Sequence, residues 1–198
     1  MPAADYITVS ELAATLTLAE TFADADMAVA ITAASREVDR RTGRKFWNDT
    51  GSRYYSPSNT MRLWVDDLTA LTGVAVDWAG DGTFATAWTL NTDFFLEPFN
   101  AVVDERPWTT ITVRQLSGRY FPSWERSVRV TGTFGWTAVP KGVKQATSVL
   151  ASRFMKRARE APFGVAGFGI DGGAVRITNY DPDVDALLSD FVRTNHAF

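Results

Sequence analysis

The chain has 198 residues, of which 45% are hydrophobic and 22% charged, as in a soluble globular protein that buries a substantial core. It contains no cysteine, which excludes disulfides, thiolate metal sites and cysteine nucleophiles. The single histidine, His196, stands two residues from the end, so neither a Ser–His triad nor a multi-histidine metal site is expected. No apolar run approaches the roughly 20 residues that span a bilayer, and we expect no signal peptide and no membrane partner.

The net charge of −3 conceals a strong segregation along the chain. Residues 1–35 carry five acidic side chains and no basic one, whereas residues 141–160 carry six basic side chains against Glu160 alone. Three interpretations remain open: solvated helix faces, complementary patches on neighbouring copies, or a basic helix that faces nucleic acid phosphates.

The first 45 residues predict two helices. Ser10 is the expected N-cap of a short one, and Asp24 or Asp26 that of a longer one. Gly43 is the residue expected just beyond the C-terminus of the longer helix. The longer helix places four apolar residues on one face: Met27, Ile31, Ala34 and Val38.

From Arg53 to Trp136 the composition shifts to Thr, Val, Trp and Phe, which predicts mostly strands. The expected strands are 53–55, 61–65, 74–78, 88–90, 94–96, 111–116 and 128–133, separated by turn signals such as Gly80-Asp81-Gly82.

A basic helix follows over 140–160, with Pro140 in its first turn and Val143, Thr147, Leu150 and Phe154 along one face. Next come a glycine-rich loop at 161–173, a short strand at 174–177, and a last helix from Asp181 with Pro182 at its first position. The apolar stripe of that helix is Val184, Leu187, Leu188 and Phe191.

These elements predict an α+β fold, in which a helical scaffold of about four helices carries an inserted antiparallel β section. We expect one domain over 1–198, with the scaffold formed by 8–45, 140–160 and 181–194 and the β insertion by about 52–136. Helices 24–42 and 140–160 should pack together, because each has a single apolar face and is unstable alone.

Three patterns resemble catalytic or metal sites but lack the necessary context. The glycine loop follows a helix and has no Gly-Lys-Ser/Thr, so it does not predict a phosphate cradle. Asp181, Asp183 and Asp185 imitate a calcium loop, but Ala186 and Val192 replace the required Gly and Glu. The carboxylates near the tryptophans show no spacing that singles out an acid and a base: Asp66, Asp67, Asp77, Asp81 and Asp93.

Six of the seven tryptophans lie between residues 64 and 136. Trp64 and Trp136 stand in apolar strand-like context and are expected in the core. Trp108 and Trp124, beside Pro107 and Pro122, are expected in loops, where they can contact partners.

Four segments resemble, in order, parts of the head–tail connector (adaptor) proteins of long-tailed bacteriophages. They cover about two-thirds of the chain. They are ITVSELAATL at 7–16, REVDRRTGRKFW at 36–47, LWVDDLTALTGVAVD at 63–77 and VTGTFGWTAVPKGVKQATSVLASR at 130–153.

The resemblance implies a non-enzymatic structural virion protein, made in the host bacterial cytoplasm and located in the head–tail neck. It implies a homo-oligomeric ring, a dodecamer, that meets the portal protein on one side and the next connector, stopper or tail-completion protein on the other. DNA would pass through a central channel without sequence-specific binding, and no cofactor is implied.

The family transfers no catalytic residues, so interface candidates come from the charged helix, the β loops and the C-terminal segment. They are Lys144, Arg153, Lys156, Arg157, Trp108, Trp124, Phe163, Phe168, Leu187, Leu188 and Phe191. Residues 161–198 are expected to act as a docking segment for a partner, with folding back onto the scaffold as the alternative. The rival function is a carbohydrate- or receptor-binding module built on the tryptophan-rich β section, and an enzyme with paired carboxylates comes third.

Overall fold

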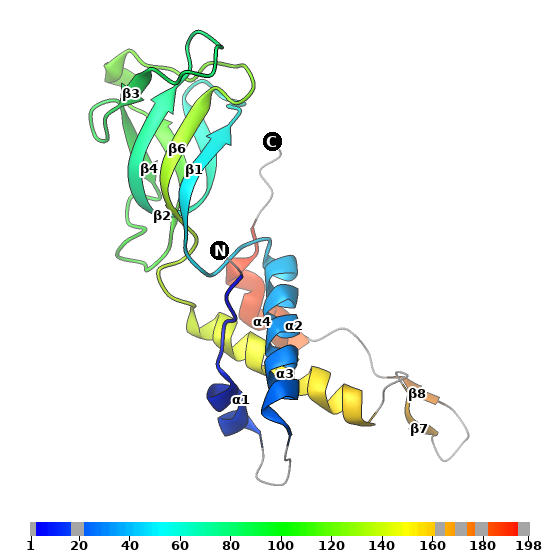
Figure 1. Cartoon of the computed structure of the whole chain (residues 1–198). Coiled ribbons are helices and arrows are strands. Elements are labelled where there is room, and N and C mark those ends of the chain that lie inside the picture. The colour runs from blue at the N-terminus through cyan, green and yellow to red at the C-terminus, as the bar shows by residue number, and fades with distance from the viewer. Residues whose placement is uncertain (1–2, 17–21, 161–164, 169–173, 177–181, 194–198) are drawn as a thin grey trace. The chain divides into compact units, whose positions relative to one another are not determined.

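The computed structural model describes residues 3–16, 22–160, 165–168, 174–176 and 182–193 (Figure 1). These residues divide into two compact units. The β unit comprises residues 45–138, and the helical unit comprises 3–44 together with the described residues of 139–193. No helix within the described ranges is both long and apolar enough to cross a membrane.

The helical unit is built on two long helices, α2 (Asp24–Thr42) and α3 (Lys141–Glu160), which pack side by side as predicted. The short helix α1 (Val9–Thr15) contacts both of them. Helix α4 (Pro182–Leu188), followed by the 3-10 turn η2 (Ser189–Phe191), packs mainly on α3. Each of the two helices buries a set of apolar side chains: Met27, Ile31, Ala34 and Val38 on α2, and Val143, Ala146, Leu150 and Ala151 on α3.

The caps of the first two helices differ from the sequence prediction. The N-cap of α1 is Thr8 rather than Ser10, because Thr8 and Glu11 form a reciprocal capping box. The N-cap of α2 is Ala23, which makes no side-chain cap, and both Asp24 and Asp26 lie in the first turn. There their charges favour the positive end of the helix dipole. Gly43 ends α2 in the left-handed conformation, as predicted.

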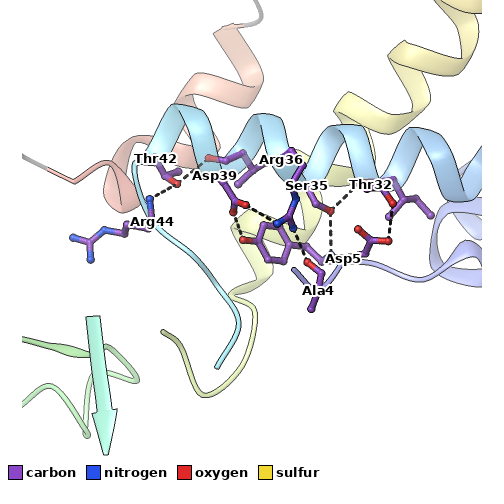
Figure 2. A network of polar contacts seen from close by, with 11 residues as sticks. Ala4, Asp5, Thr32, Ser35, Arg36, Asp39, Thr42 and Arg44 are labelled. Atoms are coloured by element: carbon purple, nitrogen blue, oxygen red, sulfur yellow. Dashed lines mark hydrogen bonds and ion pairs between the residues drawn. The ribbon is translucent and has the colours of Figure 1, made fainter. Parts of the chain in front are cut away.

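The segment before α1 is tied along α2 by polar contacts (Figure 2). Arg36 donates to the carbonyl of Ala4 at 2.7 Å, and the Thr32 hydroxyl donates to Asp5 at 2.9 Å. Ser35 accepts from the backbone N–H of Tyr6 at 3.1 Å, and the Tyr6 hydroxyl donates to Asp39. These bonds fix the chain that leads into α1.

The β unit holds one six-stranded antiparallel sheet. Five strands lie in the order β1–β6–β2–β5–β4, and β3 pairs with the far end of β2. The bounds are β1 Asp49–Tyr55, β2 Arg62–Val76, β3 Thr86–Trp88, β4 Phe94–Glu97, β5 Trp108–Val113 and β6 Val128–Phe134. The 3-10 turn η1 (Gln115–Ser117) follows β5.

Strand β2 corrects the prediction, because the two strands expected at 61–65 and 74–78 are the ends of one 15-residue strand. Its first part pairs with β5, and its second part pairs with β6. Register shifts between Trp64 and Leu68 and again between Leu71 and Gly73 mark bulges, which bend and twist a strand. The bulges explain why a simple period-2 pattern does not continue through residues 66–73.

The core of the β unit consists of large apolar side chains from all the central strands. In β6 the burial alternates strictly, with Val128, Val130 and Phe134 inward. Gly132 also faces inward, where a Cβ would lie only 2.2 Å from the carbonyl oxygen of Ala70 on β2. The close approach of these two strands therefore requires glycine at this position.

The four α-helices of the described residues and the antiparallel sheet confirm the predicted α+β class. Part of the expected glycine-rich loop is different, since Val165–Phe168 forms strand β7 and pairs with β8 (Ala174–Arg176). The expectation that the whole chain is one domain stays a prediction.

Candidate subunit interface

The basic residues predicted at an interface lie on α3 in the helical unit. Arg153 and Lys156 are exposed, whereas Lys144 and Arg157 are half-buried. Lys144 forms an ion pair with Glu11 of α1, with 2.9 Å between Nζ and Oε1. This hydrogen bond from Lys144 is the main cause that lowers the pKa of the Glu11 carboxyl, so Glu11 is ionised at neutral pH.

Three of these side chains, Lys144, Arg153 and Lys156, line a groove between α1 and α3 that the sequence did not predict. We call it the α1/α3 groove. Its volume is about 860 Å³, and its surface includes the apolar residues Ile7, Ala14 and Val149. An apolar surface edged by cations fits a partner that is itself apolar and acidic.

A second groove in the helical unit lies between the start of α2 and the end of α3. Its volume is about 550 Å³, and its lining is mostly apolar, with Phe22, Val29 and Phe154 among the residues that form it. The guanidinium of Arg159 lies 5.6 Å from the centre of the Phe22 ring. Val29 is 72% exposed, although it belongs to a helix whose other large apolar side chains are buried.

The two tryptophans predicted in loops have different surroundings in the β unit. Trp108 is the first residue of β5 and packs half-buried against the core, so its expected loop position was wrong. Trp124 is 40% exposed and makes an edge contact with Trp78 at a centroid distance of 6.5 Å. Of the two tryptophans predicted to contact a partner, only Trp124 exposes much of its side chain to solvent.

The tryptophans expected in the core follow the prediction in part. Trp136 is buried, and its indole N–H donates to Asp67 at 3.0 Å. Trp64 is only half-buried. Trp88, which the sequence left open, is buried and stacks on Phe121 at 4.9 Å.

The predicted C-terminal contacts lie partly outside the described residues. Phe163 lies outside them, and Phe168 is the last residue of β7. Leu188 is 1% exposed, which places it in the packing of the helical unit rather than on a surface that a partner can reach. Leu187 and Phe191 are half-buried, and both lie against Gly142 of α3.

Polar bonds also attach this end of the chain to α2. Arg41 forms an ion pair with Asp185 at 2.7 Å, and Arg44 donates to the carbonyl of Phe191 at 2.9 Å. The backbone N–H of Arg193 donates to the carbonyl of Thr42 at 2.7 Å. Helix α4 therefore follows the alternative in which the last helix folds back onto the scaffold.

The carboxylates considered for catalysis are engaged in the structure of the β unit. Asp77 accepts from the backbone N–H groups of Gly80 and Gly82, each at 2.8 Å, and so shapes the turn after β2. Asp93 accepts from the backbone N–H of Thr89 at 2.8 Å, which lowers the pKa of its carboxyl, and Arg119 lowers it further.

The other three carboxylates have structural partners too. Asp66 pairs with Arg53 at 2.8 Å, Asp67 accepts from Trp136, and Asp81 accepts from Thr83. Among the described residues, no group of three or more His, Asp or Glu side chains is placed to hold a metal ion. The arrangement is that of turn-forming and strand-linking carboxylates.

The sequence analysis also missed an apolar loop between β4 and β5. Phe99, Val102 and Val103 are 68%, 67% and 82% exposed, although Ala101 between them is buried. Backbone hydrogen bonds fold this loop tightly, for example from Arg106 N–H to the Ala101 carbonyl at 2.8 Å. The Ala-Val-Val run between Pro98 and Pro107 carried this signal, because apolar residues in a loop are seldom exposed without a contact to make.

Comparison with known proteins gives a result at the level of fold. No protein-family model and no curated protein sequence matches the chain. Among solved structures, it matches a chain in the neck of an empty GTA (gene transfer agent) particle computed with C6 symmetry, with a TM-score of 0.55 and 19% identity. That match covers 97% of this chain and 92% of the neck chain.

A second match is a chain in the neck of a native GTA particle computed with C12 symmetry. Its TM-score is 0.53 at 16% identity, and it covers 100% of this chain and 98% of the other. The chain shares its fold with neck proteins of phage-like particles. Because each match covers at least 97% of this chain, the likeness in fold extends over both the β unit and the helical unit.

Proposed function

We propose that this protein is a non-enzymatic structural component of the neck of a phage or phage-like particle. In that position it forms a ring of twelve copies between the portal and the next connector or the tail, and DNA passes through the central channel. The observation that carries the proposal is the fold match to neck chains over at least 97% of this sequence.

Two observations support assembly from copies of one chain: the symmetry of neck structures with the same fold, and two unlike surfaces on the helical unit of this chain. The neck structures with the same fold were computed with C6 and C12 symmetry, which is the symmetry of rings. This chain also has an apolar groove with a basic edge and a separate acidic helix end, so one copy offers two different surfaces to its neighbours. Unlike surfaces of this kind build head-to-tail contacts, which close into a ring when the rotation from copy to copy completes a full turn.

The rival carbohydrate-binding function requires exposed, coplanar aromatic rings on which a sugar can stack. Trp78 and Trp124 instead meet at 76°, and Trp78 and Tyr120 meet at 78°. Trp88 and Trp136 are buried. The described aromatic residues thus favour packing and protein contacts over a flat sugar platform.

The test is genetic and structural. The gene for this protein is deleted from the genome that encodes the particle. Negative-stain microscopy should then show filled heads and separate tails that do not join. Supplying the intact chain in trans should restore joined particles, and electron cryomicroscopy should place it in a ring at the neck. Normal tailed particles after deletion, or a location of the chain elsewhere in the particle, would contradict the proposal.

A further inference from the structure

The α1/α3 groove combines an apolar surface with an excess of positive charge. Four basic residues contribute to its lining, Lys141, Lys144, Arg153 and Lys156, and the acidic residue among the lining side chains is Glu11. Its volume of about 860 Å³ falls within the range of roughly 300–1,000 Å³ typical of binding clefts. A groove of this size accommodates several side chains of one helix.

Contacts between the two helices hold the walls of the groove in place. Besides the ion pair between Glu11 and Lys144, the hydroxyls of Thr15 and Ser148 lie 3.1 Å apart. The capping box formed by Thr8 and Glu11 fixes the first turn of α1, and Leu12 is fully buried beneath it. The groove is therefore preformed, which lowers the entropic cost of binding.

An exposed face of α2, whose Asp26 and Val29 also line the second groove, has the complementary properties. Ala25, Val29 and Ala33 are exposed and recur at intervals of four residues, so they form one apolar ridge. Asp24 and Asp26, both exposed, lie at the N-terminal end of this ridge. The ridge offers an apolar surface with acidic residues at one end, and the groove offers an apolar surface with basic residues along its lining.

We propose that the α1/α3 groove binds the N-terminal end of α2 from a second copy of this chain. The groove and the ridge are different patches, so each copy donates its ridge to one neighbour and accepts the ridge of another. This inference rests on the proposed ring of copies and deepens it by naming the two surfaces that meet.

A second copy fits these observations better than DNA does. Contacts to nucleic acid come mainly from Lys and Arg side chains to phosphates, and they gain nothing from Ile7, Ala14 and Val149 in the groove. The exposed ridge at Val29 matches that apolar surface, and contact with the groove would also bury the apolar side chains of the ridge. DNA binding is nevertheless a distinct outcome of the test.

Site-directed cross-linking tests the contact directly, because the chain has no cysteine of its own. One full-length variant carries Ser152→Cys in the groove, and another carries Ala25→Cys on the ridge. Mixed at about 1 mM, where contacts with a Kd of that order are well populated, they should give cross-linked dimers with a short bismaleimide. Each variant alone should give few, and a mixture of Ala25→Cys with Ser123→Cys, exposed in the β unit, is the matched control.

Charge exchange then tests the chemistry of the contact. A groove variant with Arg153→Glu and Lys156→Glu, and a ridge variant with Asp24→Lys and Asp26→Lys, should each lower the cross-linking yield about tenfold when present in both partners. Mixing the groove variant with the ridge variant should restore the yield, because every groove then meets a ridge of opposite charge. Circular dichroism of each variant checks that the helices remain folded.

The outcomes separate the alternatives. A yield no higher than in the Ser123→Cys control, or no rescue in the mixture, overturns the inference. Binding of a short DNA duplex that the groove variant abolishes, without cross-linking between copies, assigns the groove to DNA instead. A neck ring whose copies meet through other surfaces refutes this contact and leaves the proposed function standing, whereas absence of the chain from the neck refutes the proposed function itself.

Discussion

The two units of this protein differ in where their carboxylates lie, because the buried ones among the described residues all belong to the β unit. In the β unit, the carboxylates of Asp67, Asp77 and Asp93 are buried, and each accepts a hydrogen bond from an indole or backbone N–H of the same unit. In the helical unit, the charged side chains of α3 lie at the surface, and grooves with apolar walls remain open beside them. These three buried carboxylates find their donors inside the β unit, whereas the helical unit keeps grooves on which other molecules can bind.

The apolar loop after β4 is an exception to this contrast. Phe99, Val102 and Val103 make it the most exposed apolar part of the β unit that the structure describes, together with Leu116 at 89%. Exposed apolar patches of this kind mark contact surfaces. Under the proposed function, a partner other than a second copy is expected to contact this loop.

The largest effect should come from the tight backbone packing in the β unit. Gly135 has φ +111°, and a Cβ there would lie 1.9 Å from the carbonyl oxygen of Trp47. Gly135→Ala should therefore lower the free energy of unfolding by more than about 3 kcal/mol, because both strain and a backbone clash oppose it. Chemical denaturation followed by tryptophan fluorescence measures the change.

Gly73→Ala is the matched control, since a Cβ at Gly73 meets no atom within 4 Å and the change should cost no more than about 1 kcal/mol. The same pair tests the prediction of a single domain. If 1–198 unfolds as one cooperative unit, Gly135→Ala shifts fluorescence and helical circular dichroism together. Separate transitions for the two signals would show that the units unfold independently.

The helical unit should be most sensitive at the attachment of α4. Leu188 is 1% exposed, so Leu188→Ala should remove about 2–5 kcal/mol of the stability that holds α4 on α3. Amide hydrogen exchange of α4 measures this loss. Leu187→Ala, at a half-buried neighbouring position, should cost clearly less. An equal loss at both positions would contradict the observed packing.

Acid should weaken the β unit through Asp93. The backbone N–H of Thr89 and then the Arg119 guanidinium hold the pKa of Asp93 below the ordinary value of 3.8. The stabilisation that the ionised Asp93 carboxylate provides is therefore fully present above pH 3.8. It is lost as the pH falls through the lower pKa that Asp93 has in the folded protein. Asp93→Asn should cost about 1 kcal/mol at pH 7 and flatten the loss of stability below pH 4. Denaturation curves recorded from pH 7 to pH 2 test this, and an unchanged acid slope would refute it.

The smallest effect concerns the cap of α1. Thr8→Ala removes a capping box and should cost about 1 kcal/mol, with faster hydrogen exchange in α1. Ser10→Ala changes a neighbouring hydroxyl that does not cap the helix, so its effect should stay within about 0.5 kcal/mol. A larger effect at Ser10 would favour the cap that the sequence predicted.

Local patterns in the sequence were sufficient to predict most of the helices and strands. The apolar stripes at Met27–Val38 and Val143–Phe154 predicted α2, α3 and their packing, because a helix with one apolar face must bury it. The alternation at Val128–Thr133 predicted β6, and Pro182 marked the start of α4. The order of these segments also carried the connector resemblance, and the chain shares its fold with chains in the neck of GTA particles.

Other features depend on contacts between residues far apart in the chain. The continuity of β2 through its bulges depends on pairing with β5 and β6, which no pattern within 62–76 reveals. The burial of Leu188 beside half-buried Leu187 depends on how α4 meets α3. The α1/α3 groove exists only because two helices more than a hundred residues apart in sequence, joined by Glu11 and Lys144, form its opposite walls.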